Sequence, residues 1–172
     1  MKASWRDTIH HGKKFDLRFL DLETASGSES IEAVDHPGGV VIVPFVSDEE
    51  VVLVRNVRPV VGETLLEFPA GTVDHPESPQ TCAARELEEE TGYRAGSLQW
   101  LGEFYSAPGF CNELLHIFIA RDLTWIGQQL EATEELSPEI HPLALFKDIT
   151  GSLRDAKTLA ALFLLLQQGM ME

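Results

Sequence analysis

Several carboxylates are crowded into one segment of the sequence, residues 71–93 (GTVDHPESPQTCAARELEEETGY). Ser78 suits the N-cap of a helix and Gly92 suits its end, so the segment predicts a helix from Pro79 to Thr91. Successive residues of a helix turn by about 100°. One face of this helix should therefore carry Cys82, Glu86, Glu89 and Glu90. The opposite face should pack on a sheet through Ala84, Leu87 and Thr91.

Three glutamates on one helix face repel one another. Glu86 stands at i,i+4 from Glu90 and at i,i+3 from Glu89, and like charges at these spacings are destabilising. They also lie in the last turns, where the helix dipole disfavours each anion by about 0.3–1 kcal/mol. A bound divalent cation reverses both effects, and oxygen ligands favour Mg²⁺ or Mn²⁺ over zinc. The alternative is a solvated acidic face, and periodicity alone does not decide between the two.

The order of residues in the segment is more specific, because it resembles the Nudix box. That pattern is a Gly, five residues, a Glu, seven residues, then Arg-Glu-apolar-x-Glu-Glu-x-Gly-apolar. Its fixed positions are occupied by Gly71, Glu77, Arg85, Glu86, Leu87, Glu89, Glu90, Gly92 and Tyr93. A chance match has a probability on the order of 10⁻⁹ per start position at average residue usage. The resemblance implies a Nudix pyrophosphohydrolase that uses Mg²⁺ or Mn²⁺.

The resemblance also implies roles for individual residues. The metal ligands would be the carboxylates of Glu86, Glu89 and Glu90 and the carbonyl of Ala70. Arg85 would orient these glutamates, so we count Arg85 and Glu89 among the catalytic residues. Glu77 would either join the metal site or hold Arg85. Divalent ions suit pyrophosphate cleavage because they neutralise its oxygens and lower the pKa of a bound water.

Segments outside the box are similar to ADP-ribose pyrophosphatases and related nucleotide-sugar hydrolases. These segments are HPGGVVIVPF, VRNVRP, LLEFPAG and YSAPGF. The resemblance implies that Pro108, about sixteen residues after the box, belongs to the substrate site. It implies that Arg58 contacts phosphate, although Asn56 replaces the family's Gln nearby, and a surface charge is the alternative. It also implies that Glu67 and Glu113 line the substrate cleft, where either could instead be an ordinary strand residue.

An acid on a mobile loop usually serves as the general base in this subfamily. Glu134 and Glu135 are the candidates, with Glu131 behind them, and the spacing does not choose among the three. A solvated acidic loop is the plainer interpretation of this charge run. Aromatic stacking on a base could come from Trp5, Phe15 or Phe19, from the same chain or a partner, although core packing is the alternative use of the two phenylalanines.

The substrate that the resemblance implies is ADP-ribose or a related nucleoside diphosphate sugar, cut into a nucleoside monophosphate and a sugar phosphate. One alternative is GDP-mannose, another nucleotide sugar or a dinucleotide. An alternative of another class is a non-catalytic, nucleotide-binding sensor of Nudix type. The complete box disfavours the sensor, as does a length of 172 residues, which leaves no room for a further domain.

Alternating and apolar segments predict the fold. Strands are expected at 15–22, 40–46, 51–57, 65–68, 98–106 and 114–120, with the second and third forming a hairpin. A second helix is expected at 155–168, well buried because its apolar residues surround it. The prediction is an α/β (α+β) fold, a Nudix-type α/β/α sandwich with a mixed β-sheet. We expect a small N-terminal β extension at 1–35, used for dimerisation, and the hydrolase domain at 36–172.

The composition of the chain indicates which binding partners and which compartment to expect. The formal net charge is −15, with 28 acidic residues against 13 Lys and Arg, so we expect neither nucleic acid nor membrane as a partner. Two cysteines without metal spacing and an N-terminus without an apolar signal region favour the cytoplasm. The expected partners are a small nucleotide-sugar substrate and a second copy of the chain.

Overall fold

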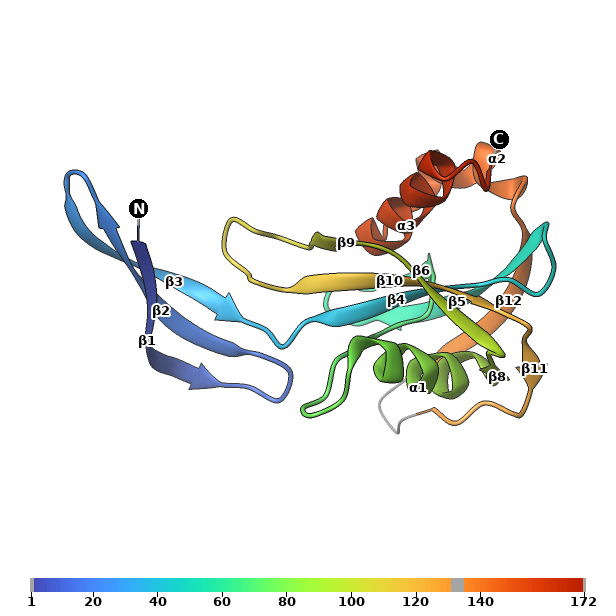
Figure 1. The fold of residues 1–172 in the computed structure, drawn as a ribbon, viewed down its shortest axis with the longest axis horizontal. Coiled ribbons are helices and arrows are strands. Elements are labelled where there is room, and N and C mark those ends of the chain that lie inside the picture. The colour runs from blue at the N-terminus through green and yellow to red at the C-terminus, as the bar shows by residue number, and fades with distance from the viewer. Residues whose placement is uncertain (1, 131–134, 172) are drawn as a thin grey trace.

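The computed structural model describes residues 2–130 and 135–171, which form a body of sheets between helices and a separate sheet at one end (Figure 1). In chain order the elements are β1 (Lys2–His11), β2 (Asp16–Thr24), β3 (Gly27–Asp35), β4 (Gly39–Pro44), β5 (Glu50–Arg58), β6 (Glu63–Glu67), β7 (Ala70–Thr72), α1 (Pro79–Thr91), β8 (Tyr93–Arg94), β9 (Ser97–Tyr105), β10 (Leu114–Arg121), β11 (Thr124–Trp125), β12 (Leu136–Pro142), α2 (Leu145–Ile149), a 3₁₀ turn (Thr150–Ser152) and α3 (Ala156–Gln167).

A mixed sheet forms the centre of the body, with strand order β7-β4-β10-β9. β10 runs parallel to β4, and the other pairs are antiparallel. Side chains of β4 alternate between two cores: Val41 and Val43 join the cluster that includes α3, and Val40 and Ile42 join the cluster that includes α1. Because α1 and α3 lie on opposite sides of the sheet, the predicted α/β/α sandwich is confirmed (Figure 1).

The predicted hairpin between the strands at 40–46 and 51–57 is wrong. β4 belongs to the central sheet, whereas β5 lies between β12 and β6 in a second, antiparallel sheet. The two strands share only an isolated bridge between Phe45 and Val51. Residues 40–46 and 51–54 are continuously apolar, a pattern of strands covered on both faces, and this pattern does not show which segments the strands pair with.

Both predicted helices are present. The Ser78 hydroxyl accepts a hydrogen bond from the Thr81 amide at 3.1 Å, and Gly92 ends α1 in the left-handed conformation at φ 75°. The second helix is α3, and the prediction that it is well buried holds only for the side that carries Thr158, Ala161, Leu162 and Leu165. The side of α3 that faces away from the sheet leaves Phe163 58% and Leu166 48% exposed.

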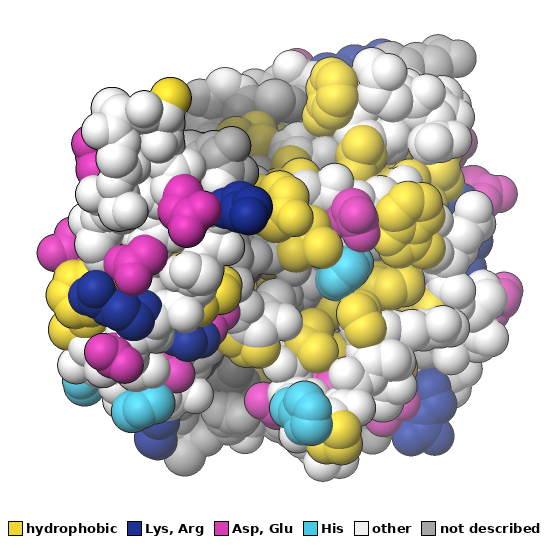
Figure 2. Space-filling model, turned by 60° about the vertical axis from the view of Figure 1, so that its left-hand side comes forward, with side chains coloured by type: hydrophobic (Ala, Val, Ile, Leu, Met, Phe, Trp, Pro, Cys, Tyr) yellow, Lys and Arg dark blue, Asp and Glu magenta, His cyan; other side chains and the backbone are white. Residues whose placement is uncertain are grey.

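The N-terminal segment contains three strands, of which the sequence predicted only β2. They form a separate antiparallel sheet, β1-β2-β3, which extends from one end of the body (Figure 1). Figure 2 shows hydrophobic side chains gathered on this side of the molecule. Trp5 and Ile9 on β1, and Phe15 in the connection between β1 and β2, are 37–46% exposed. Within the described residues, no helix is both long and apolar enough to cross a membrane.

Candidate active site

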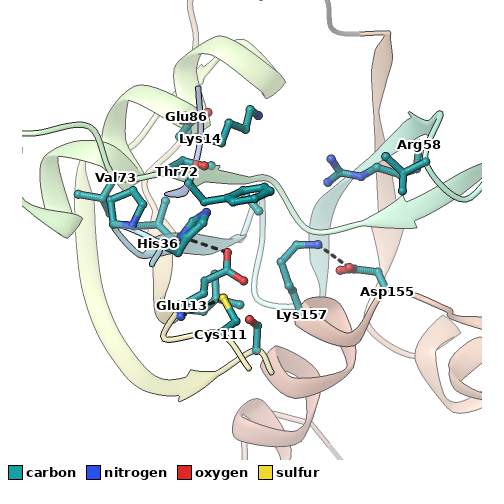
Figure 3. A pocket seen from close by; sticks show the side chains of 18 of the residues that line it. Lys14, His36, Arg58, Thr72, Val73, Glu86, Cys111, Glu113, Asp155 and Lys157 are labelled. Atoms are coloured by element: carbon teal, nitrogen blue, oxygen red, sulfur yellow. Dashed lines mark hydrogen bonds and ion pairs between the residues drawn. The ribbon is translucent and has the colours of Figure 1, made fainter. Parts of the chain in front are cut away.

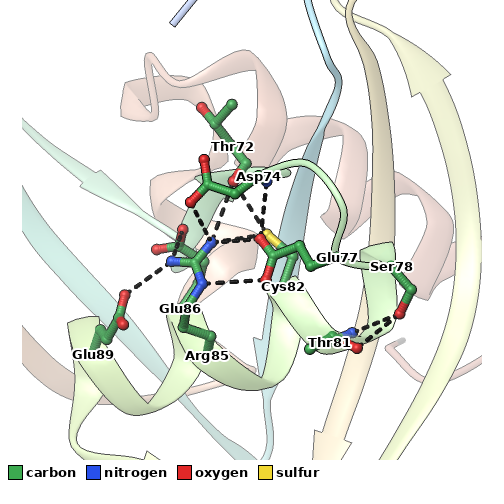
Figure 4. Close-up of polar contacts among 9 residues, drawn as sticks. All are labelled: Thr72, Asp74, Glu77, Ser78, Thr81, Cys82, Arg85, Glu86 and Glu89. Atoms are coloured by element: carbon green, nitrogen blue, oxygen red, sulfur yellow. Dashed lines mark hydrogen bonds and ion pairs between the residues drawn. The ribbon is translucent and has the colours of Figure 1, made fainter. Parts of the chain in front are cut away.

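Arg85 occupies the centre of the acidic helix α1 and gathers three glutamates (Figure 4). Its Nη2 donates to Glu77 Oε1 at 2.7 Å, and its Nε donates to Glu77 Oε2 at 3.3 Å. Its Nη1 donates to Glu86 Oε1 at 2.8 Å and to Glu89 Oε2 at 3.0 Å. One guanidinium therefore holds three carboxylates in fixed positions, which offsets the like-charge repulsion along the helix face.

The glutamates of α1 lie against the short strand β7. Glu90 Oε2 accepts a hydrogen bond from the Ala70 amide at 2.9 Å. A Cβ on Gly71 would lie 1.9 Å from the Glu86 carboxylate, so only glycine lets the strand approach the helix this closely. Glu86 and Glu90 are buried at 8% and 4% exposure, and the backbone of Ala70 is beside them. The Gly71 position of the box is thus explained by packing.

The pKa values of the groups around Arg85 are shifted by their hydrogen bonds and by burial. The hydrogen bonds from Arg85 lower the pKa of Glu77 from 4.5 to about 2. In return, the hydrogen bonds with Glu77 raise the pKa of Arg85 above its already high value. Burial raises the pKa of the Cys82 thiol, so Cys82 stays protonated and donates to the Thr72 carbonyl at 3.3 Å. Cys82 is fully buried in the core cluster that also contains Leu87, so the expectation that it lies on the face of the helix opposite Leu87 is wrong.

A cavity of about 1190 Å³ opens beside this cluster (Figure 3). Five of the protein's 13 Lys and Arg residues line it, although the chain is strongly acidic overall. These residues are Lys13, Lys14, Arg58, Arg85 and Lys157. Glu86 and Glu90 line the same cavity. A concave site with carboxylates and concentrated cations suits an anionic ligand held next to a divalent cation.

A second charge network lies across the cavity from the helix carboxylates. The Nε and Nη2 groups of Arg58 donate to Glu67 at 2.8 and 2.5 Å, and Glu67 is only 1% exposed. Lys157 Nζ lies 3.6 Å from the same carboxylate and donates to Asp155 at 2.5 Å. Hydrogen bonding to Glu67 raises the pKa of Arg58. Two cations thus share one buried carboxylate at the cavity wall, and both reach the cavity.

The structure places the residues predicted from the sequence at different depths. The cavity lining includes Arg58, Ala70, Arg85, Glu86, Glu90, Glu113 and Glu135. Glu67 lies behind Arg58, and Glu89 contacts Arg85 at the edge of the cluster. Pro108 is not part of the lining, although Ser106, Ala107 and Phe110 on either side of it are. Glu131 and Glu134 lie outside the described residues.

Sequence reasoning missed several residues of the cavity: Lys13, Lys14, His36, Asp155 and Lys157. One signal pointed to Lys157. It stands in the first turn of α3, where the helix dipole disfavours a cation, and it is the only charged residue between Ala156 and Gln167. No signal marked Lys13 and Lys14, because lysines in a polar turn are usually only solvated.

The donors of the cluster fit a hard divalent cation. Glu86, Glu89, Glu90 and the Ala70 carbonyl offer only oxygen, which Mg²⁺ and Mn²⁺ prefer. In the described part of the chain, no three His, Cys, Asp or Glu side chains are arranged as they would be around a bound metal ion. Arg85 holds Glu86 and Glu89 instead. An open arrangement on one side of a cavity is suited to a cation that the substrate also ligates.

Comparison with known proteins agrees with this arrangement. A family profile described as NUDIX domain matches residues 35–162. The chain is 34% identical over 166 residues to ADP-ribose pyrophosphatase of Bacillus subtilis, covering 94% of this chain and 90% of that protein. It is 35% identical over 176 residues to GDP-mannose pyrophosphatase of Citrobacter koseri, covering 91% of each. A crystal structure of an ADP compounds hydrolase superposes with a TM-score of 0.83 at 29% identity, covering 99% of this chain and 98% of that chain.

The chain therefore belongs to the Nudix family, as the order of residues in the segment 71–93 predicted. Nudix hydrolases use divalent metal ions, which is consistent with the oxygen donors of α1.

Proposed function

We propose that this protein hydrolyses the pyrophosphate bond of ADP-ribose or a related nucleoside diphosphate sugar, with Mg²⁺ or Mn²⁺ as cofactor. The products are a nucleoside monophosphate and a sugar phosphate. The observation that carries the proposal is the set of glutamates held by Arg85 at the edge of a cavity whose described lining holds five cations beside six carboxylates. The proposal is supported by two relatives that match over more than nine-tenths of this chain and are named ADP-ribose pyrophosphatase and GDP-mannose pyrophosphatase.

In this proposal Glu86, Glu89, Glu90 and the Ala70 carbonyl hold the metal. A cation held there would neutralise charge on the phosphate oxygens and lower the pKa of a bound water. Arg85 is a positioning residue, since its donors are directed to carboxylates rather than to the cavity centre. Glu77 in turn fixes Arg85, so of the two roles considered for Glu77 the structure favours holding the arginine.

Arg58 and Lys157 would bind the phosphates. The Nε–Nη2 edge of Arg58 is already used by Glu67, which leaves Nη1 for the substrate. A two-bond clamp through the Nε–Nη2 edge is therefore not available to the phosphate. Lys157 supplies the second cation, and Figure 3 shows it between Arg58 and the opposite wall of the cavity. Glu67 thus acts through Arg58 and Lys157, which it orients.

Glu135 or Glu134 would act as general base. Glu135 lines the cavity, and its carbonyl accepts a hydrogen bond from the Val57 amide at 3.1 Å, which anchors this end of the loop beside the phosphate-binding strand. A base must reach the proton it removes, directly or through one water. Glu135 is the one candidate base that falls within the described residues, so mutagenesis must compare it with Glu134.

We further propose a homodimer in which residues 1–35 provide contacts between copies. The sheet β1-β2-β3 has its own three strands and too few residues for a separate core. Its exposed Trp5, Ile9 and Phe15 are the type of side chain that an interface covers. Phe15 lies at the cavity, where it could stack on a base.

The proposed activity is tested by incubating the protein with Mg²⁺ and ADP-ribose, ADP-glucose, GDP-mannose, a dinucleotide and a nucleoside triphosphate, and by identifying the products. We expect nucleoside monophosphate and sugar phosphate from a diphosphate sugar, with the highest kcat/KM in that class. A preference for the triphosphate of about tenfold or more would overturn the substrate class. Nucleotide binding without any cleavage would instead support the sensor.

A further inference from the structure

Two polar side chains of the cavity, His36 and Glu113, have no substrate contact assigned above, since the family resemblance implies only that Glu113 lines the cleft and gives His36 no role. They face each other on the wall opposite Arg58, with His36 Nδ1 3.8 Å from Glu113 Oε1 (Figure 3). Their side chains are 10% and 26% exposed, and both line the cavity. A separation of 3.8 Å is too long for a hydrogen bond, so neither group satisfies the other.

The backbone fixes which nitrogen of His36 carries the proton. The Gly38 amide donates to His36 Nδ1 at 3.1 Å, so Nδ1 is the acceptor and the neutral ring carries its proton on Nε2. Within the described ranges, no residue hydrogen-bonds to Nε2, and this atom is not among the fully buried atoms that lack a partner. The Nε2–H group of His36 is therefore a donor that remains open to the cavity.

Glu113 supplies the complementary acceptor. Its carboxylate lies beside the start of β4, 3.7 Å from the position of a Cβ on Gly39, and no described residue donates a hydrogen bond to it. Gly39 pairs with Thr72 beside Gly71, so the acceptor stands next to β7, the strand that packs against the carboxylates of α1. A donor and an acceptor thus stand side by side on a wall close to the metal-binding glutamates.

We propose that His36 and Glu113 form a subsite for a sugar hydroxyl of the substrate, an inference that rests on the proposed function. A hydroxyl can accept from Nε2–H and donate to a carboxylate at the same time, whereas a phosphate can only accept. The Glu113 charge repels phosphate, which the Arg58 and Lys157 side of the cavity attracts. The two walls therefore divide the substrate into a phosphate side and a sugar side.

A hydrogen-bonded chain holds this subsite in position. The His36 amide donates to Asn112 Oδ1 at 2.7 Å, and Asn112 Nδ2 donates to Asp35 at 2.9 Å. Arg18, from β2 of the N-terminal sheet, donates to the other oxygen of Asp35 at 2.6 Å. The N-terminal sheet is thereby linked to the sugar side of the cavity. A site that reads a hydroxyl requires such fixed groups, because a loose donor discriminates poorly.

The experiment compares the wild-type enzyme with His36→Asn on ADP-ribose and on analogues that each lack one sugar hydroxyl. An asparagine oxygen can replace Nδ1 as acceptor for the Gly38 amide, whereas the Nε2–H donor is lost. His116→Asn is the matched control. His116 also faces a glutamate, with Nδ1 3.3 Å from Glu103, and it is 22% exposed but does not line the cavity.

One analogue should lack the hydroxyl that the subsite binds. For this analogue we expect the kcat/KM of the wild-type enzyme to be roughly five- to tenfold lower than for ADP-ribose, mainly because KM is higher. His36→Asn should lower kcat/KM for ADP-ribose by a similar factor and discriminate little against that same analogue. His116→Asn should retain the wild-type ratio. If His36 had only a structural role, His36→Asn would lower kcat/KM by the same factor for ADP-ribose and for every analogue. The inference is overturned if the ratio of kcat/KM between ADP-ribose and each analogue is the same in His36→Asn as in the wild type. If the wild-type enzyme cleaves none of these compounds, the proposed function fails as well.

Discussion

Replacing Glu77 with Gln tests whether Arg85 depends on its carboxylate partners. Gln keeps an oxygen for the Asp74 amide, which donates to Glu77 Oε1 at 2.9 Å, but it removes the charge that pairs with Arg85. The pKa of Glu77 is lowered from 4.5 to about 2 by Arg85. Such a shift corresponds to at most about 3 kcal/mol, and solvent screening of this partly exposed pair reduces it to about 1–2 kcal/mol.

The sign of the pH dependence follows from the lowered pKa. The charged form of Glu77 stabilises the folded state above pH 4.5, and this contribution is lost as the pH falls toward 2. Glu77→Gln should therefore lower the free energy of unfolding by about 1–2 kcal/mol at pH 7. Urea unfolding followed at pH 7 and again at pH 3 should show the difference from wild type shrinking at the lower pH.

Glu88→Gln is the matched control on the same helix. Glu88 accepts two hydrogen bonds from Arg94, at 2.7 and 3.2 Å, but this pair is exposed and lies away from the cavity. We expect a smaller loss of stability and unchanged turnover in the control, whereas Glu77→Gln should also lower kcat because Arg85 loses its orientation. The reasoning is refuted if the two variants behave alike in turnover and at both pH values.

Three further predictions concern the cavity and the assembly. Arg58→Ala and Lys157→Met should each raise KM for a diphosphate sugar by about tenfold or more through lost phosphate contacts, measured by steady-state kinetics; unchanged KM would contradict their role in phosphate binding. Either Glu134→Gln or Glu135→Gln should cut turnover while Mn²⁺ binding by calorimetry stays unchanged, and neither residue is the base if both variants remain within about twofold of wild type. Light scattering should give a dimer that becomes less stable when residues 1–35 are removed, and a fully active wild-type monomer would refute the assembly.

Local signals in the sequence predicted the acidic helix well. Ser78 and Gly92 mark its two ends by their capping chemistry, and the structure confirms both. The turn of about 100° per residue then places the glutamates of the helix on one face. The same periodicity was of no use for α3, because apolar residues lie nearly all round this helix and no polar face marks its outer side. The sequence therefore did not show that Phe163 and Leu166 face away from the sheet.

Pairing between distant segments could not be predicted in the same way. β4 and β5 are neighbours in the chain, but their partners β10 and β12 lie far along the sequence. The network of Arg58, Glu67 and Lys157 likewise joins two strands to a helix about ninety residues further on. Residues of ordinary type become a site only when the fold brings them together, which is why Lys157 and His36 were missed.

The central claim is that the glutamates of α1 hold a divalent cation that the hydrolysis requires. The most direct measurement is the rate of nucleoside monophosphate release from ADP-ribose as a function of Mg²⁺ concentration, after treatment with EDTA, for wild type and Glu90→Gln. The account predicts no turnover without metal, saturable recovery with Mg²⁺ in the wild type, and a loss of about a hundredfold or more in Glu90→Gln with the fold intact. Full turnover in excess EDTA, or wild-type rates in Glu90→Gln, would contradict it.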